Sequence, residues 1–257
     1  MSYRCTGTPT IDFANALPVP LLTGNNDNRL ADPDLPPRLK DGSLNREDHN
    51  AVILYEDGAL KEIYWKQHLV PFTEHFPYED IMPKFYQFLR SHDFHFWSEG
   101  DDPVVFETAD GVRFSTPICF EDVFGYLSAE FVREGADVIV NMTNDSWSGA
   151  VSAEMQHMAM SVFRAVENKR TMVRGTNSGI TCVIDPTGRI LAEMEPFTVG
   201  YMVTDVPIFT YADTLYTRWV NWFPKLLIIL SGALLTAGSI VRIVRKRPKS
   251  VDADNDE

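Results

Sequence analysis

The amino-acid sequence predicts a layered α/β domain that is followed by one membrane-spanning helix. Three observations support this prediction. The chain has 257 residues, enough for one sizeable α/β domain with a buried core. Strand and helix patterns alternate along residues 104–206. Near the end of the chain, the segment from Leu226 to Val241 contains no charged side chain.

The middle of the chain supplies the expected elements in order. Apolar spacing predicts a helix over residues 83–92, and two short apolar runs predict a hairpin over residues 104–119. A helix is expected over residues 122–134, a buried strand over 136–140, and a second helix over 154–168. Further strands are expected at residues 18–24, 51–55, 59–65, 171–174, 180–184 and 201–206, with a polar loop over residues 25–49.

Composition excludes several classes of function. The formal net charge of −13 argues against nucleic-acid binding, which requires a basic face. It also disfavours a peripheral protein that charge alone holds on anionic lipid. The three cysteines, Cys5, Cys119 and Cys182, show neither an even count nor metal-ligand spacing, so we expect no disulfide framework. We expect no cofactor and no metal.

The apolar segment near the C-terminus has the features of a transmembrane helix. With Trp219, Trp222 and Phe223 at one end, its hydrophobic length approaches the roughly 20 residues that cross a bilayer. The tryptophans suit the membrane interface, and a basic cluster over residues 242–249 suits the cytoplasmic side. The predicted divisions are a domain over residues 1–218, a transmembrane helix over 219–244, and a cytoplasmic tail over 245–257. A buried core helix is the alternative interpretation.

Cys119 stands where an apolar run meets a polar turn, directly before Phe120 and Glu121. A cysteine at that position has backbone N–H groups beside its sulfur, which is the arrangement that acyl transfer requires. A small buried apolar cysteine is the other interpretation. A reactive thiolate also needs a positive neighbour, for which Lys66 is the candidate. Lys66 lies just before an apolar pair and a proline, where it is either a placed cation or an exposed lysine with a buried stem.

Three segments in order carry a resemblance to a known family. The first runs from Tyr64 to Glu74, the second from Ile118 to Glu121, and the third from Asn141 to Trp147. Together they closely resemble the carbon–nitrogen hydrolase (nitrilase) superfamily, and more narrowly its membrane-bound branch, apolipoprotein N-acyltransferase. Residues 50–55, 174–180 and 214–223 also look like that branch, so the resemblance covers roughly residues 10–245.

The resemblance implies a nitrilase-like four-layer α-β-β-α sandwich, incomplete at its N-terminus, before the C-terminal transmembrane helix. It also implies an enzyme of the bacterial inner membrane, with its catalytic domain on the extracytoplasmic side and its tail in the cytoplasm. The implied reaction moves an acyl chain from a phospholipid to the N-terminal diacylglyceryl cysteine of an apolipoprotein.

The resemblance implies these site residues and roles. Cys119 would form an acyl thioester, and Lys66 would stabilise the oxyanion together with the backbone N–H of Phe120. Glu74 matches the family's additional glutamate and would orient Lys66. Glu121 matches the acidic residue two positions past the cysteine, although a carboxylate at a helix start is an equally good explanation. Asn144 and Trp147 would shape the pocket wall or serve the structure alone.

The sequence departs from the family pattern at the first catalytic residue. No glutamate before Lys66 matches the family's general base, because Glu47, Glu56 and Glu62 lie in a polar loop, a hairpin turn and the lysine's own strand. The membrane bundle that precedes the family's catalytic domain also has no match. We therefore expect a separately encoded N-terminal half as a partner. The alternatives are a membrane-tethered amidase of the same superfamily and an inactive fragment or binding module.

Overall fold

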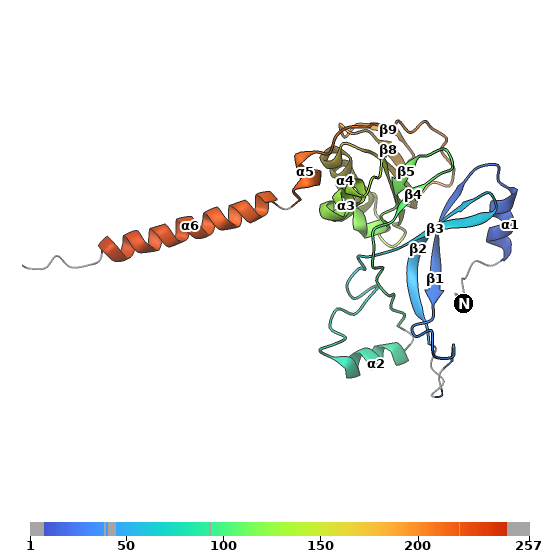
Figure 1. The fold of residues 1–257 in the computed structure, drawn as a ribbon, viewed down its shortest axis with the longest axis horizontal. Helices are drawn as coiled ribbons and strands as arrows, with labels where there is room; N and C mark the ends of the chain where they lie inside the picture. Colours follow the sequence, from blue (N-terminus) through green and yellow to red (C-terminus); the bar gives the residue numbers. More distant parts are fainter. Residues whose placement is uncertain (1–7, 39, 41–44, 93, 221, 246–257) are drawn as a thin grey trace, which may run out of the picture. The chain divides into compact units, whose positions relative to one another are not determined.

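A computed structural model of the chain describes residues 8–38, 40, 45–92, 94–220 and 222–245. The chain divides into two compact units, Met1–Arg218 and Trp219–Glu257. Two sheets organise the first unit (Figure 1). The smaller is antiparallel with strand order β1-β2-β3, made of β1 (Leu21–Arg29), β2 (Glu47–Glu56) and β3 (Ala59–Trp65).

The larger sheet has six described strands in the order in which they occur in the chain. Its centre, β5-β6-β7, is parallel, and its outer pairs are antiparallel. Carboxyl ends of parallel strands meet at one edge of a sheet, where α/β proteins place ligands. The strands are β4 (Val105–Glu107), β5 (Arg113–Ser115), β6 (Val138–Asn144), β7 (Thr171–Asn177), β8 (Cys182–Ile184) and β9 (Ile190–Glu193).

The helices of the first unit are short apart from α4, which spans Val151–Asn168. A 3₁₀ turn, η1 (Cys119–Val123), follows β5 and leads into α3. The helices are α1 (Thr8–Ala16), α2 (Pro83–Ser91), α3 (Gly125–Arg133), α4, and α5 (Leu215–Arg218).

Three clusters of buried apolar residues define the layers. In β2, Ile53 and Tyr55 pack with Ala14 of α1, whereas Val52 and Leu54 face the cluster that contains residues of β4, β5 and β6. This alternation arises because successive side chains of a strand point to opposite faces. The other face of the large sheet packs against α4 through Met172 and its neighbours. The layer order is therefore helix, sheet, sheet, helix, which is the expected α-β-β-α sandwich.

Several expected elements differ from the structure. The predicted strand over residues 201–206 is wrong: this segment pairs with no described strand, and Tyr201 and Val203 are 89% and 88% exposed. A strand forms only where a neighbour accepts its backbone hydrogen bonds. The loop expected over residues 25–49 is shorter, because pairing of β1 with β2 extends to Arg29 and Glu47. The helix expected from Asp122 begins as a 3₁₀ turn at Cys119.

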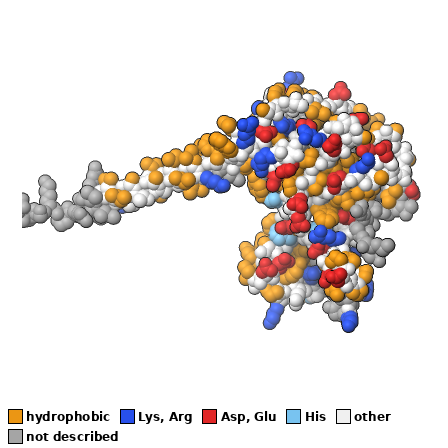
Figure 2. All heavy atoms as spheres, in the orientation of Figure 1, with side chains coloured by type: hydrophobic (Ala, Val, Ile, Leu, Met, Phe, Trp, Pro, Cys, Tyr) orange, Lys and Arg blue, Asp and Glu red, His pale blue; other side chains and the backbone are white. Residues whose placement is uncertain are grey.

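The second unit consists of one long helix, α6 (Trp222–Arg245). Its stretch Trp222–Arg242, 21 residues, is by length and composition able to cross a membrane. Figure 2 shows hydrophobic side chains along the stretch from Trp222 to Val241. Most of the basic cluster expected over residues 242–249 lies outside the described residues.

Candidate active site

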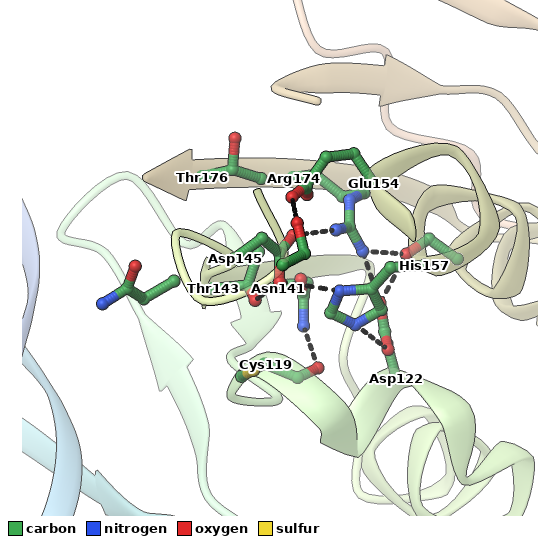
Figure 3. A network of polar contacts seen from close by, with 12 residues as sticks. Cys119, Asp122, Asn141, Thr143, Asp145, Glu154, His157, Arg174 and Thr176 are labelled. Carbon is green, nitrogen blue, oxygen red and sulfur yellow. Dashed lines mark hydrogen bonds and ion pairs between the residues drawn. The ribbon is translucent and has the colours of Figure 1, made fainter. Parts of the chain in front are cut away.

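Cys119 lies on a strained turn at the carboxyl end of the parallel strands. A single parallel bridge between Ile118 and Met142 brings the chain up to Cys119 beside β6. Cys119 has φ +51°, a left-handed conformation that is unfavourable for residues other than glycine. The Asn141 side chain holds this turn, since its Nδ2 donates to the carbonyl oxygens of Pro117 at 3.0 Å and Cys119 at 3.1 Å (Figure 3).

Glu121 joins the cysteine turn to the segment that follows the lysine. Its fully buried carboxylate accepts hydrogen bonds from the backbone N–H groups of Ile118 at 2.7 Å, Gln67 at 2.7 Å and His68 at 3.0 Å. The Tyr64 hydroxyl donates to both carboxylate oxygens, at 2.9 and 3.0 Å. The sequence offered two explanations for Glu121. These contacts give it a further one, a link that fixes the spacing of two chain segments.

We predict that Glu121→Gln destabilises the first unit. The side-chain NH₂ group would face N–H groups that are themselves donors, so some of these N–H groups would lose their acceptor. We expect a cost of about 1–3 kcal/mol at pH 4.5. Burial raises the pKa of Glu121 from 4.5 to about 7, although hydrogen bonds from Ile118, His68, Tyr64 and Gln67 oppose the rise. An acid whose pKa is raised on folding stabilises the protein fully below its unfolded pKa and loses that contribution as the pH passes the folded pKa.

The free-energy difference between wild type and Glu121→Gln should therefore shrink as the pH rises from 4.5 to 7. Urea unfolding followed by circular dichroism at several pH values measures it. A difference that stays constant across this window would contradict the predicted titration of Glu121.

Lys66 and Glu74 form a buried ion pair beside the cysteine turn. Lys66 is fully buried, and its Nζ lies 2.6 Å from Glu74 Oε2, while the Glu74 side chain is 16% exposed. The Val70 N–H donates to the same oxygen at 2.7 Å, and Asn50 Nδ2 donates to Oε1 at 3.4 Å. A turn with Phe72 at φ +63° returns the chain from Lys66 to Glu74. The structure therefore places Lys66 as a buried cation, not as an exposed lysine.

A cavity of about 1310 Å³ connects these elements. Cys119 and Glu74 both line it, whereas Lys66 and Glu121 are fully buried and do not line it. Phe120, Asn144 and Trp147 also line the cavity, and the Trp147 side chain is 76% exposed. The N–H of Phe120 lies in the first turn of η1, where helical N–H groups have no acceptor within the helix. Five of the seven residues that the sequence proposed therefore line one cavity, and Lys66 and Glu121 connect to it through Glu74 and Ile118.

The sequence did not reveal the polar residues that support this site. Asn50 reaches Glu74 from β2, and Asn141 holds the cysteine turn from β6. The sequence signal that could have identified both asparagines is a polar residue within an otherwise apolar, buried strand. Asp122, His157 and Arg174 are also buried or nearly so, but nothing in the sequence alone indicates that they meet. None of the groups of histidine, cysteine and carboxylate residues in the described part of the chain could hold a metal ion.

A comparison by sequence identifies the family to which this fold belongs. Residues 34–214 match the family described as carbon-nitrogen hydrolase. This chain is a carbon–nitrogen hydrolase family member. Apolipoprotein N-acyltransferase 1 of Treponema pallidum is 43% identical over 242 residues, which cover 92% of this chain and 43% of that protein. Apolipoprotein N-acyltransferase 1 of Treponema denticola is 38% identical, over 86% of this chain and 41% of that protein.

This carbon–nitrogen hydrolase chain therefore spans less than half the length of the curated relatives that it matches. Among solved structures, a mutant of the amidase from Nesterenkonia sp. AN1, with acrylamide added at its active-site cysteine, is similar with a TM-score of 0.48 and 18% identity. The match covers 72% of this chain and 63% of the amidase.

Proposed function

We propose that this chain carries the acyl-accepting part of an apolipoprotein N-acyltransferase. One observation carries the proposal: Cys119 lies on a strained turn in the same cavity as Glu74, whose carboxylate holds the fully buried Lys66. The two Treponema relatives, both named apolipoprotein N-acyltransferase, support this substrate class over a general amidase. The acyl donor is a phospholipid, and the acceptor is the diacylglyceryl cysteine at the N-terminus of an apolipoprotein.

In the first half-reaction, the sulfur of Cys119 attacks the ester carbonyl of the donor. The C–S bond forms, the ester C–O bond breaks, and the thiol proton leaves with the lysophospholipid alkoxide. Negative charge develops on the carbonyl oxygen in the tetrahedral intermediate. Lys66 and the N–H of Phe120 would stabilise it, and removing one such donor costs about 10²–10³ in rate.

In the second half-reaction, the neutral α-amine of the acceptor attacks the thioester. A C–N bond forms and the C–S bond breaks, so that the amine proton returns to the thiolate of Cys119. Glu74 keeps Lys66 in place during both halves, because an ammonium without a partner in a buried site would carry a high energetic cost. Asn144 and Trp147 form part of the wall against which the substrates lie.

The reaction also requires a general base for the thiol proton. Among the described residues, the carboxylates that line the cavity are those of Glu74 and Glu195. The Glu74 carboxylate already forms an ion pair with Lys66. We propose that the base comes from polypeptide outside residues 8–245, either as part of the same protein or as a separately encoded N-terminal half. Correct placement of such a base contributes typically 10²–10⁴-fold to the rate.

Membrane attachment fits a lipid donor. We propose that α6 spans the inner membrane, with residues 1–218 as an extracytoplasmic catalytic domain and the tail over residues 245–257 in the cytoplasm. Within the first unit, exposed apolar side chains also gather in the segment between β3 and β4. Soluble monomeric proteins rarely expose large groups of apolar side chains. They include Phe72 at 63%, Ile81 at 77%, and Phe88 at 53% exposure, so this segment offers a surface to lipid.

A transfer assay tests the proposal. The full chain, with and without the co-expressed N-terminal portion of the Treponema pallidum relative, is given a phospholipid labelled in its sn-1 acyl chain and a diacylglyceryl-cysteine peptide. We expect label on Cys119 that hydroxylamine removes, followed by hydroxylamine-resistant label on the peptide amine. We expect both only when the N-terminal portion is present.

The other outcomes separate the alternatives. Release of free fatty acid or hydrolysis of short amides, without peptide acylation, would support the tethered amidase. Failure to label Cys119 in either mixture would support an inactive binding module. A stable adduct on the chain alone would show that residues 1–257 already contain a sufficient base.

A further inference from the structure

A buried polar network connects the cysteine turn with the cavity wall (Figure 3). Asp122 belongs to η1, the turn that begins at Cys119, and is fully buried. Asp145 directly follows β6 and is 1% exposed. Its chain neighbour Asn144 lines the cavity, as does Trp147. Each buried carboxylate therefore lies on a segment that contributes to the proposed site.

His157 of α4 contacts both carboxylates. Its Nε2 lies 3.0 Å from Asp122 Oδ1, and its Nδ1 lies 2.8 Å from Asp145 Oδ1. Arg174 of β7 lies across the same pair, with Nη1 at 2.5 Å from Asp122 Oδ2 and Nη2 at 3.3 Å from Asp145 Oδ2. Ser161 also donates to Asp122, at 2.6 Å. The two carboxylates are thus linked by two basic side chains.

The contacts define the protonation state of His157. Ionised carboxylates only accept hydrogen bonds, so an imidazole that bonds to one carboxylate through each nitrogen must carry a proton on both. Burial lowers the pKa of His157, but the hydrogen bonds to Asp122 and Asp145 and the charge of Asp122 outweigh this effect and raise the pKa to about 10, against the opposing charge of Arg174. Glu154, which hydrogen-bonds Ser148, also faces this cluster, and burial raises its pKa.

His157 differs from Arg174 in its access to the site. Arg174 is fully buried, whereas the His157 side chain is 13% exposed and lines the cavity. We propose that His157 is a positioning residue for Cys119, which holds the nucleophile turn through Asp122 and the cavity wall through Asp145. The inference rests on the proposed role of Cys119 as the nucleophile.

The strain at Cys119 explains why such a residue is needed. A left-handed φ at a residue other than glycine persists only where surrounding contacts hold it, because it costs about 1–3 kcal/mol. The Asn141 side chain holds the backbone carbonyl of Cys119, and His157 holds the turn through the Asp122 carboxylate. Without His157, the turn can relax and move the sulfur, and a shift of about 1 Å can cost about 10²-fold in rate.

The test measures the reactivity of Cys119 without any acyl substrate. We expect His157→Gln in the full chain to slow alkylation of Cys119 by iodoacetamide at pH 7.5 by roughly 10- to 100-fold. Peptide mass spectrometry separates Cys119 from buried Cys182, whose pKa burial raises to about 11. The matched control is His92→Gln at an exposed histidine, and it should react like wild type. A rate for His157→Gln within twofold of wild type would overturn the proposal.

Chemical rescue distinguishes positioning from a general packing defect. His157→Ala leaves a space beside the cavity that added imidazole can enter, and only the doubly protonated form can bond to both carboxylates. At a subsaturating concentration, and relative to wild type at the same pH, imidazole should restore alkylation of Cys119 more at pH 6 than at pH 8.5, because the fraction of free imidazole that carries the second proton falls between these values. Equal rescue at both pH values would contradict a role for the cation.

A second variant covers the case in which substitution of His157 prevents folding. Asp145→Asn keeps the shape of the side chain but removes the negative charge to which His157 bonds. Asp145 itself makes no hydrogen bond to the cysteine turn among the described contacts. We expect it to slow Cys119 alkylation as well, by roughly tenfold. Unchanged alkylation in a folded Asp145→Asn protein would overturn the proposal. If the variants change Cys119 alkylation as expected but the wild-type chain with the N-terminal portion transfers no acyl group, the proposed function alone is wrong.

Discussion

Cys119→Ala is expected to abolish the acyl adduct and to reduce acyl transfer by roughly 10³-fold or more. Without the sulfur, the two half-reactions lose the covalent intermediate that connects them, whereas the cavity and the Lys66–Glu74 pair remain. Intact-protein mass spectrometry after incubation with phospholipid measures the adduct directly. Binding of the phospholipid, followed by co-sedimentation with vesicles, should change by less than twofold.

Two further substitutions at this position separate chemistry from strain. Cys119→Ser keeps the shape but offers a hydroxyl, which is a much weaker nucleophile than a thiolate. Cys119→Gly should be equally inactive but more stable than Cys119→Ala by about 1 kcal/mol, because glycine adopts φ +51° without penalty. Equal stability of the glycine and alanine variants would show that the turn is not strained. An adduct of normal yield in Cys119→Ala would place the nucleophile elsewhere.

Glu74→Ala is expected to be among the most destabilising single substitutions in the first unit. It removes the carboxylate 2.6 Å from Lys66 Nζ and leaves a fully buried ammonium without its partner. Breaking one side of a buried ion pair costs about 3–5 kcal/mol, and we expect the lower end because Glu74 is partly exposed to the cavity. Chemical denaturation followed by circular dichroism measures the loss.

A double-mutant cycle identifies the source of that loss. Lys66→Met with Glu74→Ala removes the unpaired charge, so the double variant should be more stable than Glu74→Ala alone. Its adduct formation should nonetheless fall by about 10²–10³-fold, because the oxyanion has lost a donor. If the stability losses of the two single variants simply add in the double variant, Glu74 acts by packing and not by its charge. Normal adduct formation in Lys66→Met would contradict the proposed role of the lysine.

The sequence indicated the residues that we propose to react, but not the residues that hold them. Cys119, Lys66 and Glu74 stand in segments whose order and spacing are specific, so a reader of the sequence can find them. Asp122 and His157 are 35 positions apart and meet only because α4 packs beside η1. Contacts of that kind depend on tertiary packing, and no local pattern carries them.

The fold shows the same division. The buried run in β2 and the parallel strand β6 were evident from continuous apolar residues. Residues 201–206 have strand-like composition but no described partner, and composition alone cannot supply one. The helix α1 was missed because residues 8–16 have few strong helix formers, and Ala14 is placed by packing on Ile53 and Tyr55.

The contacts of Glu121 have a consequence for how this site can vary. Three of its four hydrogen-bond partners are backbone N–H groups, at Gln67, His68 and Ile118, which every residue except proline can provide. The side chains at positions 67 and 68 can therefore vary without removing these hydrogen bonds, whereas Ile118 is 5% exposed and packs in the apolar core. Mutational tolerance around the site should be uneven as a result. A library that randomises positions 67 and 68 would keep many active clones, and one that randomises position 121 would keep almost none.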